Sequence, residues 1–246
     1  MHNNKKIIIQ KFVGSIITSL GFVGFIVFGQ KFFQQQILIK ECVIMFLIAF
    51  GGYVYFRLSK NKWIKILSVF LMCVTMYLLW QNRILNPERI IIIIFNGTIM
   101  FLYHSYFRKM IFVKPFIIGL SWISWLYFFT LNFHFWFYLQ QFIFISLLTI
   151  PFDISTIDRD KIFTLPKKYG KDKVVVLLRI MSVLYVLLSF EFPFHFTINA
   201  FIITVILNVF LFFNFTFQLP YVYIFYDGII FLQMLVLWVL EKVWVW

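Results

Sequence analysis

The sequence predicts an all-α, polytopic membrane protein that forms a single domain over residues 1–246. Hydrophobic residues make up 63% of the chain and charged residues 13%, whereas soluble domains have about 45–50% and about 25%. Apolar runs of about 20 residues, the length that crosses a bilayer as a helix, recur along the chain. Basic residues gather in alternate connections between these runs. These three observations exclude an ordinary soluble domain.

Nine apolar segments are long enough to form transmembrane helices. The first follows Lys5, Lys6 and Lys11, but it is too long for a signal peptide and no small-x-small cleavage site follows it. We therefore expect it to be a retained helix. Short turns separate the fourth, fifth and sixth segments. The nine expected helices cover residues 12–30, 38–56, 63–80, 90–107, 112–131, 133–150, 174–190, 196–217 and 221–242.

The distribution of basic residues predicts the orientation of the helices. If the N-terminus is cytoplasmic, 16 of the 22 Lys and Arg residues lie in or beside cytoplasmic segments. Because cytoplasmic loops are enriched in Lys and Arg, an N-in, C-out bundle in the cytoplasmic (inner) membrane is favoured. The net charge of +13 is then explained by these loops, and no nucleic-acid partner is expected. The cysteines Cys42 and Cys73 lie in apolar segments, so no disulfide is predicted.

The segment 151–160 holds three of the nine acidic residues, Asp153, Asp158 and Asp160. This segment follows the sixth helix, on the predicted cytoplasmic side. If the helix continues, Asp153 and Asp160 lie seven residues apart on nearly the same face, which Thr156 flanks. Two carboxylates in this arrangement suit a hard cation such as Mg²⁺. The alternative is a solvated helix end that Arg159 and Lys161 neutralise.

Two motifs resemble those of one family. Asp153-Ile-Ser-Thr-Ile-Asp158-Arg-Asp160, followed by Thr164-Leu-Pro166 and Gly170, resembles the second aspartate motif of the UbiA superfamily of intramembrane prenyltransferases, with Thr156 in place of one aspartate. Tyr103-His-Ser-Tyr-Phe-Arg108-Lys109 looks like the family's Tyr-Ser-x-x-x-Lys-Arg motif, with the basic pair reversed. The nine-helix, N-in arrangement also resembles the family.

The resemblance implies transfer of a prenyl group from a prenyl diphosphate to an aromatic or other lipophilic acceptor. It implies that Asp153, Asp158 and Asp160 bind Mg²⁺ and that Asp153, Asp160 and Tyr103 are catalytic. The pocket would face the cytoplasm, with Arg108 and Lys109 lining it at the diphosphate.

The sequence departs from the family at the end of the second helix. The first aspartate motif is absent there, and Arg57, Lys60 and Lys62 stand in that region. Arg57 and Lys60 are expected to contact the diphosphate directly, because guanidinium and ammonium groups bind phosphate oxygens. The alternative is ordinary loop charge. Without the first motif, a non-enzymatic lipid-binding protein or a subunit of a membrane complex remains a second reading.

Polar residues inside the predicted helices have mostly structural explanations. Arg179 and Asp227 lie at similar depths near the cytoplasmic end, so they either pair with each other or line a polar cavity. Interhelical hydrogen bonds are expected for the remaining residues. These residues are Asn96, Gln140, Gln141, Asn208 and Gln233.

Overall fold

The computed structural model describes residues 2–58, 62–107, 110, 113–155, 157, 164–213 and 221–244. In these residues it contains helices and no strand. The bounds are α1 His2–Phe32, α2 Ile39–Leu58, α3 Lys62–Gln81, α4 Pro87–Ser105, α5 Val113–Thr130, α6 Phe135–Ser155, α7 Leu165–Tyr169, α8 Lys171–Ser189, α9 Phe194–Phe212, the π-helix η3 Tyr223–Asp227 and α10 Gly228–Trp244.

Each predicted segment corresponds to one long helix of the described chain. The largest difference is in α1, which begins at His2 instead of residue 12, because helical hydrogen bonding continues through a basic stretch that an apolar pattern leaves out. The short helix α7 and the π-helix at the start of the last segment were not predicted. Among the described residues, six helices are long and apolar enough to cross a membrane. The count of nine spans stays a prediction.

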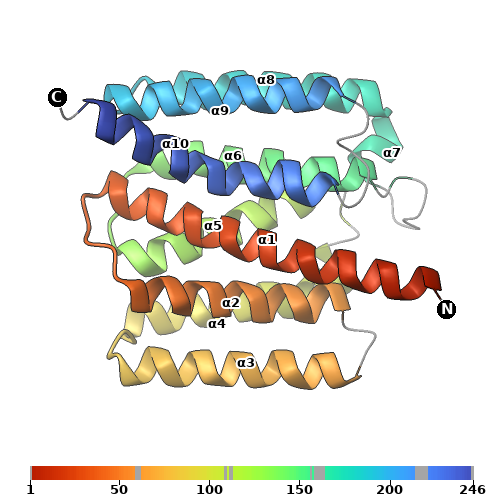
Figure 1. Ribbon diagram of the computed structural model, residues 1–246, viewed down its shortest axis with the longest axis vertical. Coiled ribbons are helices and arrows are strands. Elements are labelled where there is room, and N and C mark those ends of the chain that lie inside the picture. The colour runs from red at the N-terminus through yellow and green to blue at the C-terminus, as the bar shows by residue number, and fades with distance from the viewer. Residues whose placement is uncertain are drawn as a thin grey trace.

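The long helices run back and forth with the two chain ends at opposite ends of the bundle (Figure 1). The start of α1 therefore lies at the same end as the last turns of α2, α4 and α6 and the first turns of α3, α5 and α8. We call this the N-terminal end, and the other the far end. The connections that are rich in Lys and Arg join helices at the N-terminal end. Its assignment to the cytoplasm stays a prediction from charge.

Six helices form a closed ring in which each packs against the next, in the order α1, α5, α6, α8, α9 and α10, and α10 packs against α1. The other three long helices flank this ring. Helix α2 packs on α1, α3 packs on α2, and α4 packs on α5. This arrangement leaves α3 at the edge of the molecule (Figure 1).

Side chains of the described residues meet across the inside of the ring near the far end. The rings of Phe32 on α1 and Phe137 on α6 stack with centroids 3.9 Å apart, and Phe28 on α1 meets Phe196 on α9 at 5.4 Å. These helices are not neighbours in the ring, so the contacts occupy its interior. Aromatic packing of this kind stabilises the association of the helices.

Buried amides connect the same helices in the middle of the bundle. Gln233 on α10 donates to the hydroxyl of Tyr185 on α8 at 2.7 Å and to Gln141 on α6 at 3.4 Å. Asn199 on α9 donates to the Gln233 carbonyl at 2.7 Å. The prediction of interhelical hydrogen bonds is confirmed for all five intramembrane amides, Asn96, Gln140, Gln141, Asn208 and Gln233.

The close approach of α1 to α10 depends on glycine. A Cβ atom on Gly21 would lie 2.9 Å from the carbonyl oxygen of Asp227, and one on Gly24 would lie 3.1 Å from the Cα atom of Phe231. Both contacts are with backbone atoms, of Asp227 at the end of η3 and of Phe231 in α10. Small residues at membrane helix interfaces allow backbones to approach in this way.

Candidate functional site

Asp153 lies near the end of α6 at the N-terminal end of the bundle, and 1% of its surface is exposed. Pro151 stands inside the same helix, where its ring removes one backbone hydrogen bond. The helix nevertheless continues to Ser155. Hydroxyl groups bind nearby carbonyls: Thr149 donates to Ser146 at 2.8 Å and Ser155 to Phe152 at 2.7 Å. The predicted acidic residue is therefore held in a helical, buried position.

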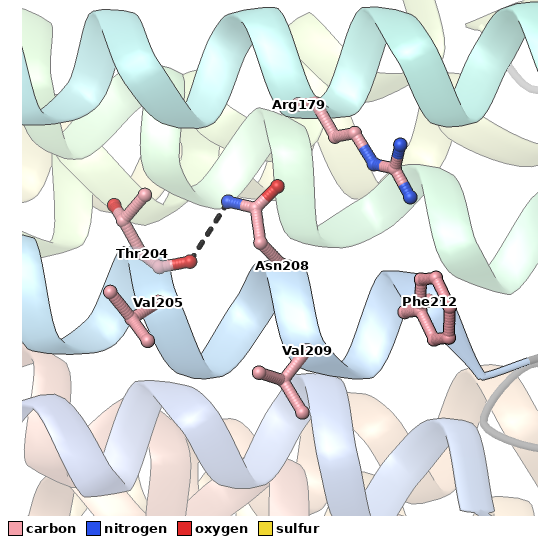
Figure 2. A pocket seen from close by; sticks show the side chains of 6 residues that line it. All are labelled: Arg179, Thr204, Val205, Asn208, Val209 and Phe212. Atoms are coloured by element: carbon pink, nitrogen blue, oxygen red, sulfur yellow. Dashed lines mark hydrogen bonds between the residues drawn. The ribbon is translucent and has the colours of Figure 1, made fainter.

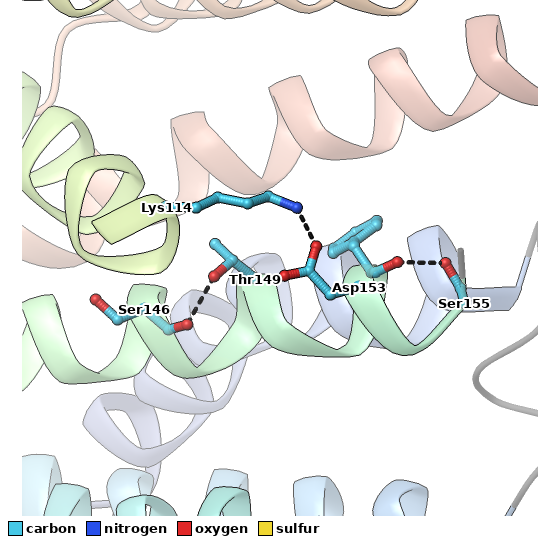
Figure 3. A network of polar contacts seen from close by, with 6 residues as sticks. Lys114, Ser146, Thr149, Asp153 and Ser155 are labelled. Carbon is cyan, nitrogen blue, oxygen red and sulfur yellow. Dashed lines mark hydrogen bonds and ion pairs between the residues drawn. The ribbon is translucent and has the colours of Figure 1, made fainter. Parts of the chain in front are cut away.

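Lys114, in the first turn of α5, forms an ion pair with Asp153. Figure 3 shows its side chain reaching across from α5 to the carboxylate on α6. The Lys114 side chain is 15% exposed and that of Asp153 2%. Removing one partner of a buried pair leaves a charge in a poorly solvating environment. The pair therefore joins the start of α5 to the end of α6.

Lys114 is one of the 16 basic residues on the predicted cytoplasmic side, and no motif in the sequence indicates it as a site residue. The order of the helices could have indicated this contact, because two consecutive antiparallel helices bring the start of the first beside the end of the second. Lys114 is the second residue of α5 and Asp153 is the third from the end of α6. Their contact follows from this hairpin.

The other predicted site residues are only partly within the described chain. Tyr103 lies in the last turn of α4 and is half-buried. Arg57 lies in the last turn of α2, but its side chain is outside the described part. The predicted residues outside the described chain are Lys60, Arg108, Lys109, Asp158 and Asp160. The roles of these residues stay predictions. Of the three motif carboxylates, Asp153 is the one that lies in the described part of the chain.

Of the two alternatives for Arg179 and Asp227, the ion pair is not formed among the described side chains. Asp227, at the end of η3, accepts a hydrogen bond from the hydroxyl of Thr18 on α1. Arg179 lies on α8 beside α9, and α8 is separated from η3 in the ring by α9. The two residues share a depth but face different neighbours, which depth along the sequence cannot reveal.

Comparison with solved structures identifies the architecture. A solved structure of a digeranylgeranylglyceryl phosphate synthase, which is a UbiA-superfamily prenyltransferase, superposes with a TM-score of 0.56. The match covers 98% of both chains at 18% sequence identity. The protein has a UbiA-like fold. No family model matches the sequence, and no curated protein matches it. The predicted UbiA resemblance is thus confirmed at the level of the fold.

The described residues show no complete Mg²⁺ site. No group of three or more His, Cys, Asp or Glu side chains gathers among the described residues. One oxygen of Asp153 also accepts a hydrogen bond from the ammonium of Lys114. An ammonium on a ligand oxygen repels a divalent cation. Magnesium at Asp153, Asp158 and Asp160 therefore stays a prediction from the resemblance.

Proposed function

We propose that this protein transfers the prenyl group of a prenyl diphosphate to an aromatic or other lipophilic acceptor. The observation that carries the proposal is the buried Asp153, at the first position of a UbiA-like aspartate motif, in a chain with a UbiA-like fold over nearly its whole length. An ionisable residue kept at this level of burial in a membrane protein is a functional candidate. The reaction site is expected at the N-terminal end, facing the cytoplasm.

The proposed reaction needs stabilisation of negative charge. The bond between the first prenyl carbon and the diphosphate oxygen breaks, and the diphosphate leaves with the electron pair. The acceptor atom then bonds to the prenyl carbon and loses a proton. Cationic groups aimed at the leaving oxygens lower the barrier of such a step. The proposed contacts of the diphosphate are Arg57, Lys60, Arg108 and Lys109. We add Lys114 to these contacts, because Asp153 holds its ammonium in position.

The decisive experiment is a prenyl-transfer assay on the full-length protein in membranes, with prenyl diphosphates of several lengths and added Mg²⁺. We expect wild-type protein to release diphosphate and Asp153→Asn to be slower by about 100-fold, the loss typical of removing one group that stabilises transition-state charge. The matched control is Asp172→Asn, because Asp172 is an exposed carboxylate at the same end of the bundle. This control should retain wild-type activity. Equal activity of Asp153→Asn and Asp172→Asn would contradict the proposed role of Asp153.

A second candidate function is lipid binding without catalysis, alone or as a subunit of a membrane complex. Two observations favour it: Asp153 is already neutralised by Lys114, and aromatic side chains of α1, α6 and α9 meet inside the ring. Wild-type protein that releases no diphosphate with any prenyl diphosphate and acceptor, yet purifies with a bound isoprenoid lipid, would favour this second candidate.

A further inference from the structure

Arg179 is an exposed cation whose nearest exposed neighbours on the same face of α8 are apolar, and the charged residue of that face, Asp172, lies seven residues earlier. Val176, Ile180 and Val183 on the same helix are all exposed, as Arg179 is. Within the part of the chain that the structure describes, no side chain pairs with the Arg179 guanidinium. Charged residues at membrane depth usually pair or extend toward the membrane surface. The guanidinium of Arg179 therefore lies on an apolar surface of the bundle, where an anionic ligand can supply the counter-charge.

An open groove of about 590 Å³ begins at this guanidinium and runs along α9. The α9 residues in it recur every three or four positions, so they share one face of the helix. In Figure 2 the Arg179 side chain extends from α8 toward Phe212, the last residue of α9. The residues that line the groove are Arg179, Thr204, Val205, Asn208, Val209 and Phe212.

The groove also contains one fixed hydrogen-bond acceptor. The amide nitrogen of Asn208 donates to the hydroxyl of Ser182 and to the carbonyl of Thr204, both at 2.9 Å. These two bonds use both N–H groups of the amide. They orient the amide so that its oxygen lies on the Arg179 side of the side chain (Figure 2). The groove thus offers a cation and an acceptor beside an apolar wall.

We propose that this groove binds an anionic phospholipid of the bilayer. The phosphate would contact Arg179, a headgroup hydroxyl would donate to the Asn208 oxygen, and an acyl chain would lie along Val205 and Val209. Guanidinium groups bind phosphate through two parallel hydrogen bonds. A free phosphate ion leaves the apolar wall uncovered, whereas a phospholipid matches both parts of the groove.

The depth of Arg179 is compatible with this ligand. Arg179 lies six residues after Lys173, which is about 9 Å along the helix axis. Helical side chains tilt toward the N-terminus of their helix, and long basic side chains extend toward the membrane surface. The guanidinium therefore points toward the end of α9 at Phe212, and Val205 lies seven residues before that end. This site lies between α8 and α9, and does not depend on the proposed prenyl transfer at Asp153.

The test is thermal unfolding of the full-length protein in detergent with added phosphatidylglycerol or phosphatidylcholine. We expect phosphatidylglycerol to raise Tm by roughly 2–4 °C more than phosphatidylcholine. This is the shift expected for a chain of this length when the concentration of one bound ligand is about fivefold above its Kd. Arg179→Gln should abolish this difference. The matched control Lys173→Gln removes an exposed charge from the same helix and should keep it.

A second variant tests the groove while Arg179 is retained. Val209→Trp fills the apolar wall, so it should also abolish the difference, and native mass spectrometry should show loss of a bound phosphatidylglycerol molecule. The proposal is wrong if Arg179→Gln keeps the difference, or if Lys173→Gln loses it equally. It is also wrong if soluble glycerol phosphate produces the same shift, because the ligand would then be the phosphate alone.

Discussion

Replacing Lys114 by methionine is expected to destabilise the protein by about 3–5 kcal/mol, the usual effect of removing one partner of a buried ion pair. The Asp153 carboxylate would keep its charge in a buried position without the ammonium of Lys114. For a chain of this length, the loss corresponds to a decrease in Tm of roughly 6–20 °C. Thermal unfolding of the purified protein in detergent measures the decrease.

A second ion pair in the same molecule provides the control. Lys31 pairs with Glu241 at the far end, with side-chain exposures of 19% and 30%. Pairs that remain in contact with solvent contribute about 0–1 kcal/mol, so Lys31→Met should change Tm little. The double variant Lys114→Met, Asp153→Leu should recover most of the stability, because it removes both charges of the pair. Equal effects of Lys114→Met and Lys31→Met would contradict this account of the Lys114–Asp153 pair.

The double variant also separates stability from activity. It removes the Asp153 carboxylate but is expected to fold, so any loss of prenyl transfer in it cannot be attributed to unfolding. A double variant that transfers prenyl groups at the wild-type rate would remove both Asp153 and Lys114 from the proposed reaction.

Gly21→Ala is expected to destabilise the protein by about 1–3 kcal/mol, the usual range for overpacking a well-packed contact. The new methyl group would lie 2.9 Å from the backbone oxygen of Asp227 and 3.5 Å from the Cβ atom of Ile230. A backbone atom cannot turn away as a side chain can, so α1 and α10 must separate. The separation would also lengthen the hydrogen bond from Thr18 to Asp227. Thermal unfolding should show a decrease in Tm.

Gly97→Ala is the matched control for this substitution. Gly97 also lies inside a long helix, but apart from its own stretch of that helix no described atom lies within 4 Å of a Cβ built on it. Alanine is favoured over glycine in helices by about 1 kcal/mol, so Tm should stay constant or rise slightly. If Gly21→Ala behaves like Gly97→Ala, the approach of α1 to α10 does not depend on glycine at position 21.

The helices of this protein could be predicted from the sequence because apolar run length is a local property. Segments such as 63–80 and 112–131 correspond closely to α3 and α5. The start of α1 could not be predicted in this way, because its first turns contain basic and polar residues and an apolar run begins only after them. The contacts between helices could not be predicted, since almost every face of such helices is apolar and periodicity then gives no direction.

The candidate site was predicted in part for the same reason. Asp153 stands out as an acidic residue in an apolar chain, and its segment carries the motif. Lys114 does not stand out, because basic residues are common at the ends of membrane helices. The sequence left open whether Arg179 and Asp227 pair or line a polar cavity, because depth along a helix does not specify the face on which a side chain lies.

The sequence by itself determined that the chain is a helical membrane protein, where its long helices lie, and which acidic segment is unusual. These properties depend on the solvation of neighbouring residues along the chain. Only the tertiary structure decided that Asp153 pairs with Lys114, that Asp227 is bound by Thr18, and that Arg179 faces an open groove. Those contacts depend on which helix faces meet, and close packing of small and large side chains from distant segments selects the faces.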